Sequence, residues 1–257
     1  MAGEKTDILA PVDLPAALGL LTRLPIPVDG EAAIARGACA AWAWPVAGLV
    51  VGGLAGGVAW AALAAGLPPG IAALLALACQ AALTGAMHED GLADSLDGLW
   101  GGWTRERRLE IMKDSHIGAF GVTGLILAFA LRWQILVHLI AVGLSPIAAL
   151  VALAAASRVS MVVLMGSLPQ ARDGGLSAKV GRPGATTTGI AVVLGLGIAV
   201  LALGWNAVPL ALAMALAGAL WALVAMRRIG GQTGDILGAG QMLTEMAGGI
   251  ILLIVLG

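Results

Sequence analysis

Long apolar stretches alternate with polar segments along this chain. A helix needs about 20 apolar residues to cross the hydrocarbon of a bilayer, and seven stretches approach or exceed that length. The predicted spans are Trp42–Ala65, Gly70–His88, Gly118–Val142, Pro146–Leu168, Thr187–Leu203, Val208–Met226 and Leu237–Leu256. The second is expected to run past the membrane into charged sequence. The pattern predicts an all-α, polytopic integral membrane helix bundle of about seven transmembrane helices, forming a single domain over residues 1–257.

The segments between these spans fall into two groups. Three are short and uncharged, at residues 66–70, 143–146 and 204–208. The others are longer and polar: an N-terminal arm (1–37) and residues 89–117, 169–186 and 227–236. Every Lys and Arg outside the predicted spans lies in the second group. Because basic loops stay in the cytoplasm, this pattern places the N-terminus and the polar segments there and the C-terminus outside.

Composition supports the membrane interpretation and excludes some functions. The chain is 60% hydrophobic and 11% charged, whereas soluble domains carry about 25% charged residues. Its formal net charge of −1 gives no reason to expect a nucleic-acid partner. Cys39 and Cys79 stand in apolar surroundings without a CxxC pair, which is typical of small core residues and not of a zinc or redox site.

The acidic residues concentrate in one segment. Seven of the 15 lie in residues 88–121, and Asp90, Asp94 and Asp97 follow helical spacing that places them on one face. No Lys or Arg occurs between His88 and Arg105, although a merely solvated face would interleave them. The pattern favours a divalent cation, and Mg²⁺ in particular, because Mg²⁺ takes hard oxygen ligands and shares them with substrate phosphates. Zinc is disfavoured because the second His of an HExxH motif is missing.

The acidic segment ends in a second polar group. Lys113 and Asp114 precede Gly118 and Gly121, two glycines expected to let the backbone come close to a ligand. Neighbouring acidic and basic groups suit a metal-bound phosphate, because carboxylates hold the cation while Lys or Arg neutralises the remaining oxygens.

Further polar residues lie on the same predicted side. Arg158 interrupts an apolar span, where it could either bind a ligand or snorkel to the surface. Arg172 belongs to a Gly-rich basic loop. Thr233 and Asp235 begin the last helix, where either a phosphate or metal contact or simple helix capping would account for them.

Several of these motifs together resemble the cobalamin synthase family of adenosylcobinamide-GDP ribazoletransferases. The resemblance rests on "HEDGLADSLDG", "LEIMKDSHIGAFG" and "GGQTGDILGA", and extends to "LLTRLPIP" and "WAWPVAGLVVGG". It implies a Mg²⁺-dependent, multi-pass enzyme of the bacterial cytoplasmic (inner) membrane whose active face is cytoplasmic. Such an enzyme joins alpha-ribazole, or its 5′-phosphate, to adenosylcobinamide-GDP. It releases GMP and forms adenosylcobalamin or the 5′-phosphate of adenosylcobalamin.

The resemblance implies roles for the residues in its motifs, and the chemistry of the neighbouring cationic residues Lys113, Arg158 and Arg172 adds candidates for holding phosphate oxygens. The expected catalytic residues are His88, Asp97 and Asp114. The expected Mg²⁺ ligands are Asp90, Asp94, Asp97, Asp114 and Asp235. The residues expected to bind substrate are Lys113, Ser115, Arg158, Arg172 and Thr233. Glu89 departs from the family pattern, in which that position is more often apolar, so it is left out of the set.

Other functions remain open at this point. "DSLDG" resembles the opening motif of CDP-alcohol phosphotransferases, but Gly101 and Gly102 stand where that motif continues with Ala-Arg. A cation transporter would need polar groups with access from both sides, and the uncharged external segments argue against it. An intramembrane metalloprotease would need histidines that are missing. The sequence leaves open a homo-oligomer and the choice between ribazole and its phosphate.

Overall fold

The fold is known from a computed structural model that describes residues 8–257; the first seven residues of the predicted N-terminal arm, with Lys5, lie outside the described residues. Apart from one isolated bridge between Gln170 and Gln232, the described chain contains helices and no strands. The elements are α1 (Asp13–Leu21), α2 (Gly30–Arg36), η1 (Gly37–Ala43), α3 (Trp44–Ala64), α4 (Pro69–Thr84), α5 (Met87–Gly101), α6 (Arg105–Ile111), α7 (Ala119–Ala141), α8 (Pro146–Ser167), α9 (Leu176–Val180), α10 (Ala185–Leu203), η2 (Gly204–Asn206), α11 (Ala207–Ile229) and α12 (Gly234–Leu256).

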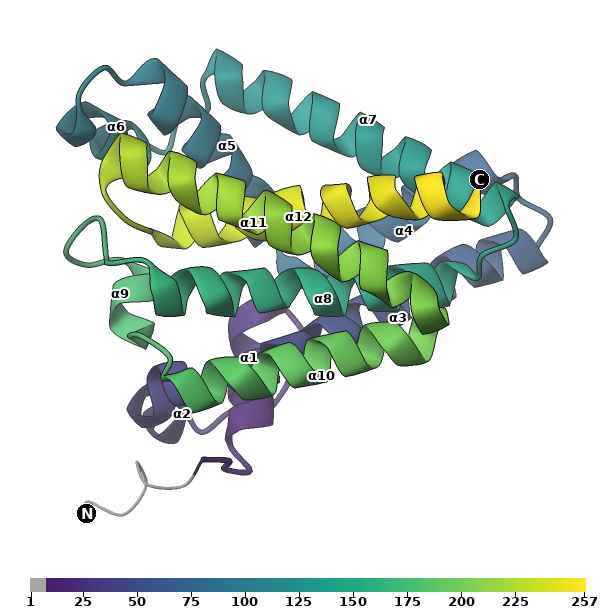
Figure 1. Ribbon diagram of the computed structural model, residues 1–257, viewed down its shortest axis with the longest axis horizontal. Coiled ribbons are helices and arrows are strands. Elements are labelled where there is room, and N and C mark those ends of the chain that lie inside the picture. Colours follow the sequence, from purple (N-terminus) through teal and green to yellow (C-terminus); the bar gives the residue numbers. More distant parts are fainter. Residues whose placement is uncertain (1–7) are drawn as a thin grey trace.

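Five helical stretches in the described chain are long and apolar enough to span a membrane: Gly30–Ala64, Ala119–Ala141, Pro146–Ser167, Ala185–Ile229 and Gly234–Leu256. The fourth stretch contains both α10 and α11, which run in opposite directions along the bundle (Figure 1). The bent pair α4 and α5 supplies a sixth stretch if it is counted as one span. The all-α, polytopic membrane fold is therefore confirmed, and each predicted span corresponds to a helix.

The predicted second span differs from the structure at its C-terminal end. Gly85 and Ala86 both adopt left-handed backbone conformations, with φ of 63° and 56°, and the chain bends by 87° between α4 and α5. The helical chain does continue into the charged sequence, as expected, but it does so as a separate helix, α5, after the bend. The 16 residues of α4 extend only about 24 Å. The four acidic residues of α5 lie beyond the bend, and we treat α5 as lying outside the membrane-spanning segments.

The two ends of the bundle differ in chemistry. Figure 1 shows α6, α9, the loop before α9 and the start of α12 together at the left end, and α5 extends toward them. These are the polar segments of the sequence. The right end of the same view holds the C-terminus and the short, uncharged turns. The connecting segments that carry charged residues are thus gathered at one end of the bundle.

Glycines let the central helices approach closely. A side chain on Gly48 or Gly52 of α3 would collide with the backbone of α8 at Ala154 or Leu150. The same holds for Gly56, where a Cβ would lie 2.5 Å from the Cα of Ile147. Small residues at such positions let membrane helices pack through their backbones. The α3–α8 pair therefore forms a tightly packed centre for the bundle.

Candidate active site

The crossing of α5 over α12 brings the acidic residues of two distant segments together. A Cβ on Gly91 would lie 2.9 Å from the carbonyl oxygen of Asp235, and one on Gly238 would lie 3.4 Å from the Cα of His88. Because both crossing positions lack a side chain, the first turn of α12 packs directly on α5. Asp90 and Asp94 consequently lie near enough to Asp235 for the three carboxylates to repel one another.

Two cavities meet at Asp90. The first, of about 140 Å³, has mainly apolar walls, with Arg172 and Asp235 among the few charged groups on its lining. The second, of about 330 Å³, is lined by polar residues of α5 and of the loop after α6, including Asp94. Asp90 belongs to the lining of both cavities. Asp90 therefore stands at the boundary between an apolar and a charged compartment.

The start of α12 forms a small hydrogen-bonded group. Arg172 donates to Asp235 Oδ2 from Nη2 at 3.1 Å, and the Thr233 hydroxyl lies 3.1 Å from the same oxygen. Thr233 Oγ1 also accepts a 3.3 Å bond from the N–H of Ile236 and so caps α12. The capping alternative raised for Thr233 is thus what the structure contains, and its contact with substrate stays a prediction.

Asp97 is turned away from both cavities toward the start of α7. The N–H of Gly118 donates to Oδ2 at 2.7 Å and the N–H of Gly121 donates to Oδ1 at 2.9 Å. A Cβ on either glycine would collide with this carboxylate. These two glycines were expected to let a ligand come close to the backbone. In the structure, the side chain of Asp97 occupies that space. Its expected roles as metal ligand and catalytic residue stay predictions, with both oxygens already bonded.

The carboxylate cluster has an electrostatic consequence at Asp94. Partial burial and then the nearby carboxylates of Asp90, Asp235 and Asp97 raise the pKa of Asp94 to about 7, while Arg172 opposes the shift. Carboxylates gathered in this way cannot all ionise freely without a cation among them. A cation bound among these carboxylates would therefore reduce their mutual repulsion.

The loop after α6 contributes the exposed wall of the second cavity. Lys113, Asp114 and Ser115 all line it. Asp114 Oδ1 accepts a 3.1 Å bond from the N–H of His116 and lies 2.7 Å from the His116 ring Nδ1. These contacts lower the pKa of Asp114 and raise the pKa of His116. Asp114 is therefore held ionised on the charged side of the site.

The donor set fits Mg²⁺ shared with a substrate phosphate better than a closed protein cage. Among residues 8–257, no group of three or more His, Cys, Asp or Glu side chains is arranged to hold a metal ion. Mg²⁺ is commonly bound by one or two carboxylates together with phosphate oxygens and water. Asp90 and Asp94, whose mutual repulsion a cation would relieve, are suited to that arrangement.

Two predicted site residues, His88 and Arg158, lie elsewhere. Arg158 is only 2% exposed and donates from Nη1 to the carbonyl oxygen of Ala154 at 2.9 Å. It does not snorkel to the surface, so that alternative is wrong. His88 and Arg158 line a small internal cavity of about 10 Å³ and belong to neither of the two larger ones.

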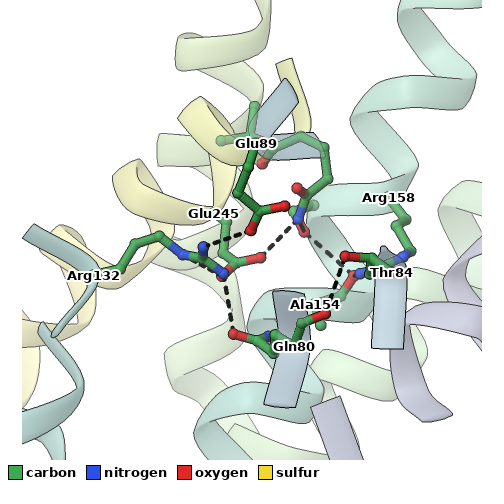
Figure 2. Close-up of polar contacts among 10 residues, drawn as sticks. Gln80, Thr84, Glu89, Arg132, Ala154, Arg158 and Glu245 are labelled. Atoms are coloured by element: carbon green, nitrogen blue, oxygen red, sulfur yellow. Dashed lines mark hydrogen bonds and ion pairs between the residues drawn. The ribbon is translucent and has the colours of Figure 1, made fainter. Parts of the chain in front are cut away.

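Around that small cavity the structure contains a charge network that sequence reasoning missed (Figure 2). Arg132 of α7 donates to Glu89 Oε1 at 3.2 Å, to Glu245 Oε1 at 2.9 Å and to Gln80 Oε1 at 3.0 Å. Gln241 donates to Glu245 Oε2 at 2.7 Å. The network joins α4, α5, α7 and α12. Arg132 and Glu245 stand in predicted spans, where a charged side chain signals a buried partner, and that signal could have found them.

Comparison with known proteins gives consistent results. A family model described as cobalamin-5-phosphate synthase matches residues 13–254. An adenosylcobinamide-GDP ribazoletransferase of Bradyrhizobium diazoefficiens is 47% identical over 245 residues, covering 95% of this chain and 92% of its own length. One of Brucella anthropi with the same description is 41% identical over 247 residues, covering 90% of this chain and 92% of its own. No solved structure matches the chain.

Proposed function

The chain belongs to the cobalamin-5-phosphate synthase family, and from this premise we propose that it joins alpha-ribazole, or its 5′-phosphate, to adenosylcobinamide-GDP and releases GMP. The observation that carries the proposal is the position of Asp90 between an apolar and a charged cavity. A reaction between two substrates requires both to be held with their reacting atoms close together, and two cavities that share a residue allow this. Membership in this family argues against the two alternatives raised by the sequence, a CDP-alcohol phosphotransferase and a cation transporter.

The proposed reaction is a phosphoryl transfer. A ribazole hydroxyl oxygen attacks the phosphorus nearer cobinamide, and a new P–O bond forms as the P–O bond to the GMP phosphate breaks. GMP leaves with the electron pair of that bond. The hydroxyl proton passes to a carboxylate. Asp114 suits this role better than Asp97, because Asp114 lines the charged cavity while both oxygens of Asp97 accept backbone hydrogen bonds.

Cationic side chains would hold the pyrophosphate. Lys113 lines the charged cavity and Arg172 the apolar one, so they approach the shared wall from opposite sides. Positioning and charge neutralisation supply most of the catalysis in phosphoryl transfer. Asp90 and Asp94 would hold Mg²⁺ jointly with substrate phosphate oxygens. When bound, the ion would act as a Lewis acid on those oxygens.

We further propose that the charged end of the bundle faces the cytoplasm at the bacterial inner membrane. The proposal rests on the distribution of basic residues, because Lys and Arg near membrane helices are retained on the cytoplasmic side. Both substrates would then reach the site from the cytoplasm. Variants that carry a single cysteine, introduced by Ser115→Cys or Trp205→Cys, test this orientation. A thiol reagent that does not cross the membrane, added to intact cells, should react at position 205 in the opposite turn and leave position 115 unmodified.

The test of the reaction is a reconstituted assay. Purified protein in proteoliposomes would receive both substrates with Mg²⁺, and GMP would be measured by chromatography. Chelator should abolish GMP release, and Asp90→Asn should lower kcat/KM by about 100-fold or more. Glu106→Gln on exposed α6 serves as the control and should retain activity. Absence of GMP release in every condition would refute the proposed function.

A further inference from the structure

The apolar cavity beside Asp90 has walls suited to a flat aromatic ring. Met87, Met161 and Met165 line it together with Trp44. Three of these side chains are almost fully buried, with exposures of 4% for Met161, 1% for Met165 and 3% for Trp44. Thioethers are polarisable and make favourable contacts with aromatic rings, and a Trp ring can pack against another ring. The walls therefore match a rigid, weakly polar ring system.

One side of the same cavity is polar. Asp90, Arg172 and Asp235 belong to its lining. Arg172 Nη2 is engaged with Asp235, whereas Arg172 Nη1 is buried and has no hydrogen-bond partner among the described residues. Buried donors in folded proteins normally have an acceptor, so this guanidinium N–H is available to an oxygen atom of a molecule bound in the cavity. The expected occupant thus has an apolar part and a part rich in oxygen.

The size of the cavity selects between the two substrates of the proposed reaction. Its volume is about 140 Å³, and a cavity of about 150 Å³ accommodates a benzene ring. The cavity is therefore on the scale of an aromatic ring, which can project into it from its open side, and it is far too small for a corrin macrocycle. The larger, charged cavity across Asp90 remains for the pyrophosphate of the second substrate.

We propose that the apolar cavity binds the base of ribazole, with the ribose directed toward Asp90 and Arg172. This inference rests on the proposed function and specifies which substrate occupies which compartment. The methionine pair Met161 and Met165 then sets which bases the protein accepts. The ribose hydroxyl that attacks phosphorus lies at the boundary between the cavities, because Asp90 stands at that boundary.

The first test narrows the cavity. Met161→Phe and Met165→Phe should each raise KM for ribazole by about tenfold while KM for adenosylcobinamide-GDP stays within about twofold. Met214→Phe is the matched control, because Met214 is also buried, at 5% exposure, but lies on α11 outside the cavity. It should leave both constants unchanged. Unchanged KM for ribazole in both cavity variants, with turnover retained, would overturn the inference.

A second variant covers the case in which the narrowed cavities prevent folding. Met161→Ala enlarges the cavity and should shift the ratio of kcat/KM toward a riboside whose base carries an additional fused ring, by about tenfold. An unchanged ratio would count against the inference.

Equilibrium dialysis with ribazole alone separates this inference from the proposed reaction. Binding to wild type that weakens in Met165→Phe supports the cavity assignment even where no GMP is released. Turnover with no effect of any cavity variant retains the reaction and refutes the assignment. Failure of wild type both to bind ribazole and to turn over refutes both.

Discussion

The N–H of Gly121 donates a 2.9 Å hydrogen bond to the carboxylate of Asp97, 24 positions earlier in the chain. The same carboxylate accepts a second bond from Gly118, so a negative charge stands at the start of α7. Free backbone N–H groups and the helix dipole both favour an anion there. An acidic residue that the sequence marked as a ligand thus joins α5 to α7.

We predict that Gly121→Ala destabilises the protein because its Cβ would collide with the Asp97 carboxylate. Overpacking of this kind costs about 1–3 kcal/mol, and thermal unfolding in detergent, followed by circular dichroism, would measure it. Gly57→Ala on α3 is the control, since a Cβ there meets no atom within 4 Å. Equal midpoints for the two variants would contradict the close approach.

A second prediction concerns pH and Asp94. Its pKa of about 7 in the folded protein exceeds the ordinary value of 3.8, so the folded state binds the extra proton between these values. The stability of metal-free protein should therefore fall as pH rises from about 4 to about 7 and level off above. Asp94→Asn should flatten this part of the curve.

The same variant tests the link between Asp94 and a cation. In chelator, the unfolding midpoint of wild type should decline across the pH window more steeply than that of Asp94→Asn. Added Mg²⁺ at neutral pH should raise the midpoint of wild type more than that of the variant, because only the carboxylate gains by binding the ion. Parallel pH curves would rule out Asp94 as the titrating group.

A third prediction concerns Arg132, the centre of the buried network in Figure 2. Arg132→Met leaves the carboxylates of Glu89 and Glu245 buried without their partner, which should cost about 3–5 kcal/mol. The fraction of protein that stays folded after heating in detergent would report the loss. Adding Glu245→Gln should recover part of it, since one uncompensated charge is removed.

An exposed pair provides the comparison for that experiment. Arg107 contacts Glu110 at 2.7 Å, but its side chain is 60% exposed. Arg107→Met should therefore leave stability nearly unchanged, because water and salt screen an exposed ion pair. A loss as large as that of Arg132→Met would show that burial of the network is not the cause.

A fourth prediction uses two neighbouring glycines of α3. Gly52→Ala should lower stability because its Cβ would collide with the backbone of α8 at Leu150, whereas on Gly53 a Cβ would meet only Val151 Cγ2 at 3.9 Å. The two variants, Gly52→Ala and Gly53→Ala, make the same chemical change at adjacent positions. Resistance to heating in detergent, followed by gel filtration, should therefore separate them. Equal behaviour would contradict the tight α3–α8 contact.

The sequence predicted the helices well because a membrane span is a local property of some twenty residues. It did not predict the bend between α4 and α5. Gly85 permits a left-handed backbone, but Ala86 gives no such signal, because residues with a side chain rarely adopt a positive φ. Without that bend, α5 would continue in the direction of α4.

The spacing of Asp90, Asp94 and Asp97 predicted that they share one face of a helix. In the structure, these residues have different neighbours. Asp90 is exposed between two cavities, whereas Asp97 is 7% exposed and bonded to α7. Spacing along one helix fixes relative direction but not which neighbouring helix each direction meets. Glu89 illustrates the same limit, because its partner Arg132 lies 43 positions away.

The gathering of charged segments at one end of the bundle has an energetic consequence for the cell. Under the proposed function, both substrates arrive and both products depart on the same side of the membrane. No charge then crosses the bilayer during a turnover, so the transmembrane voltage does no work on the reaction. The reaction should run equally well in energised and de-energised membranes.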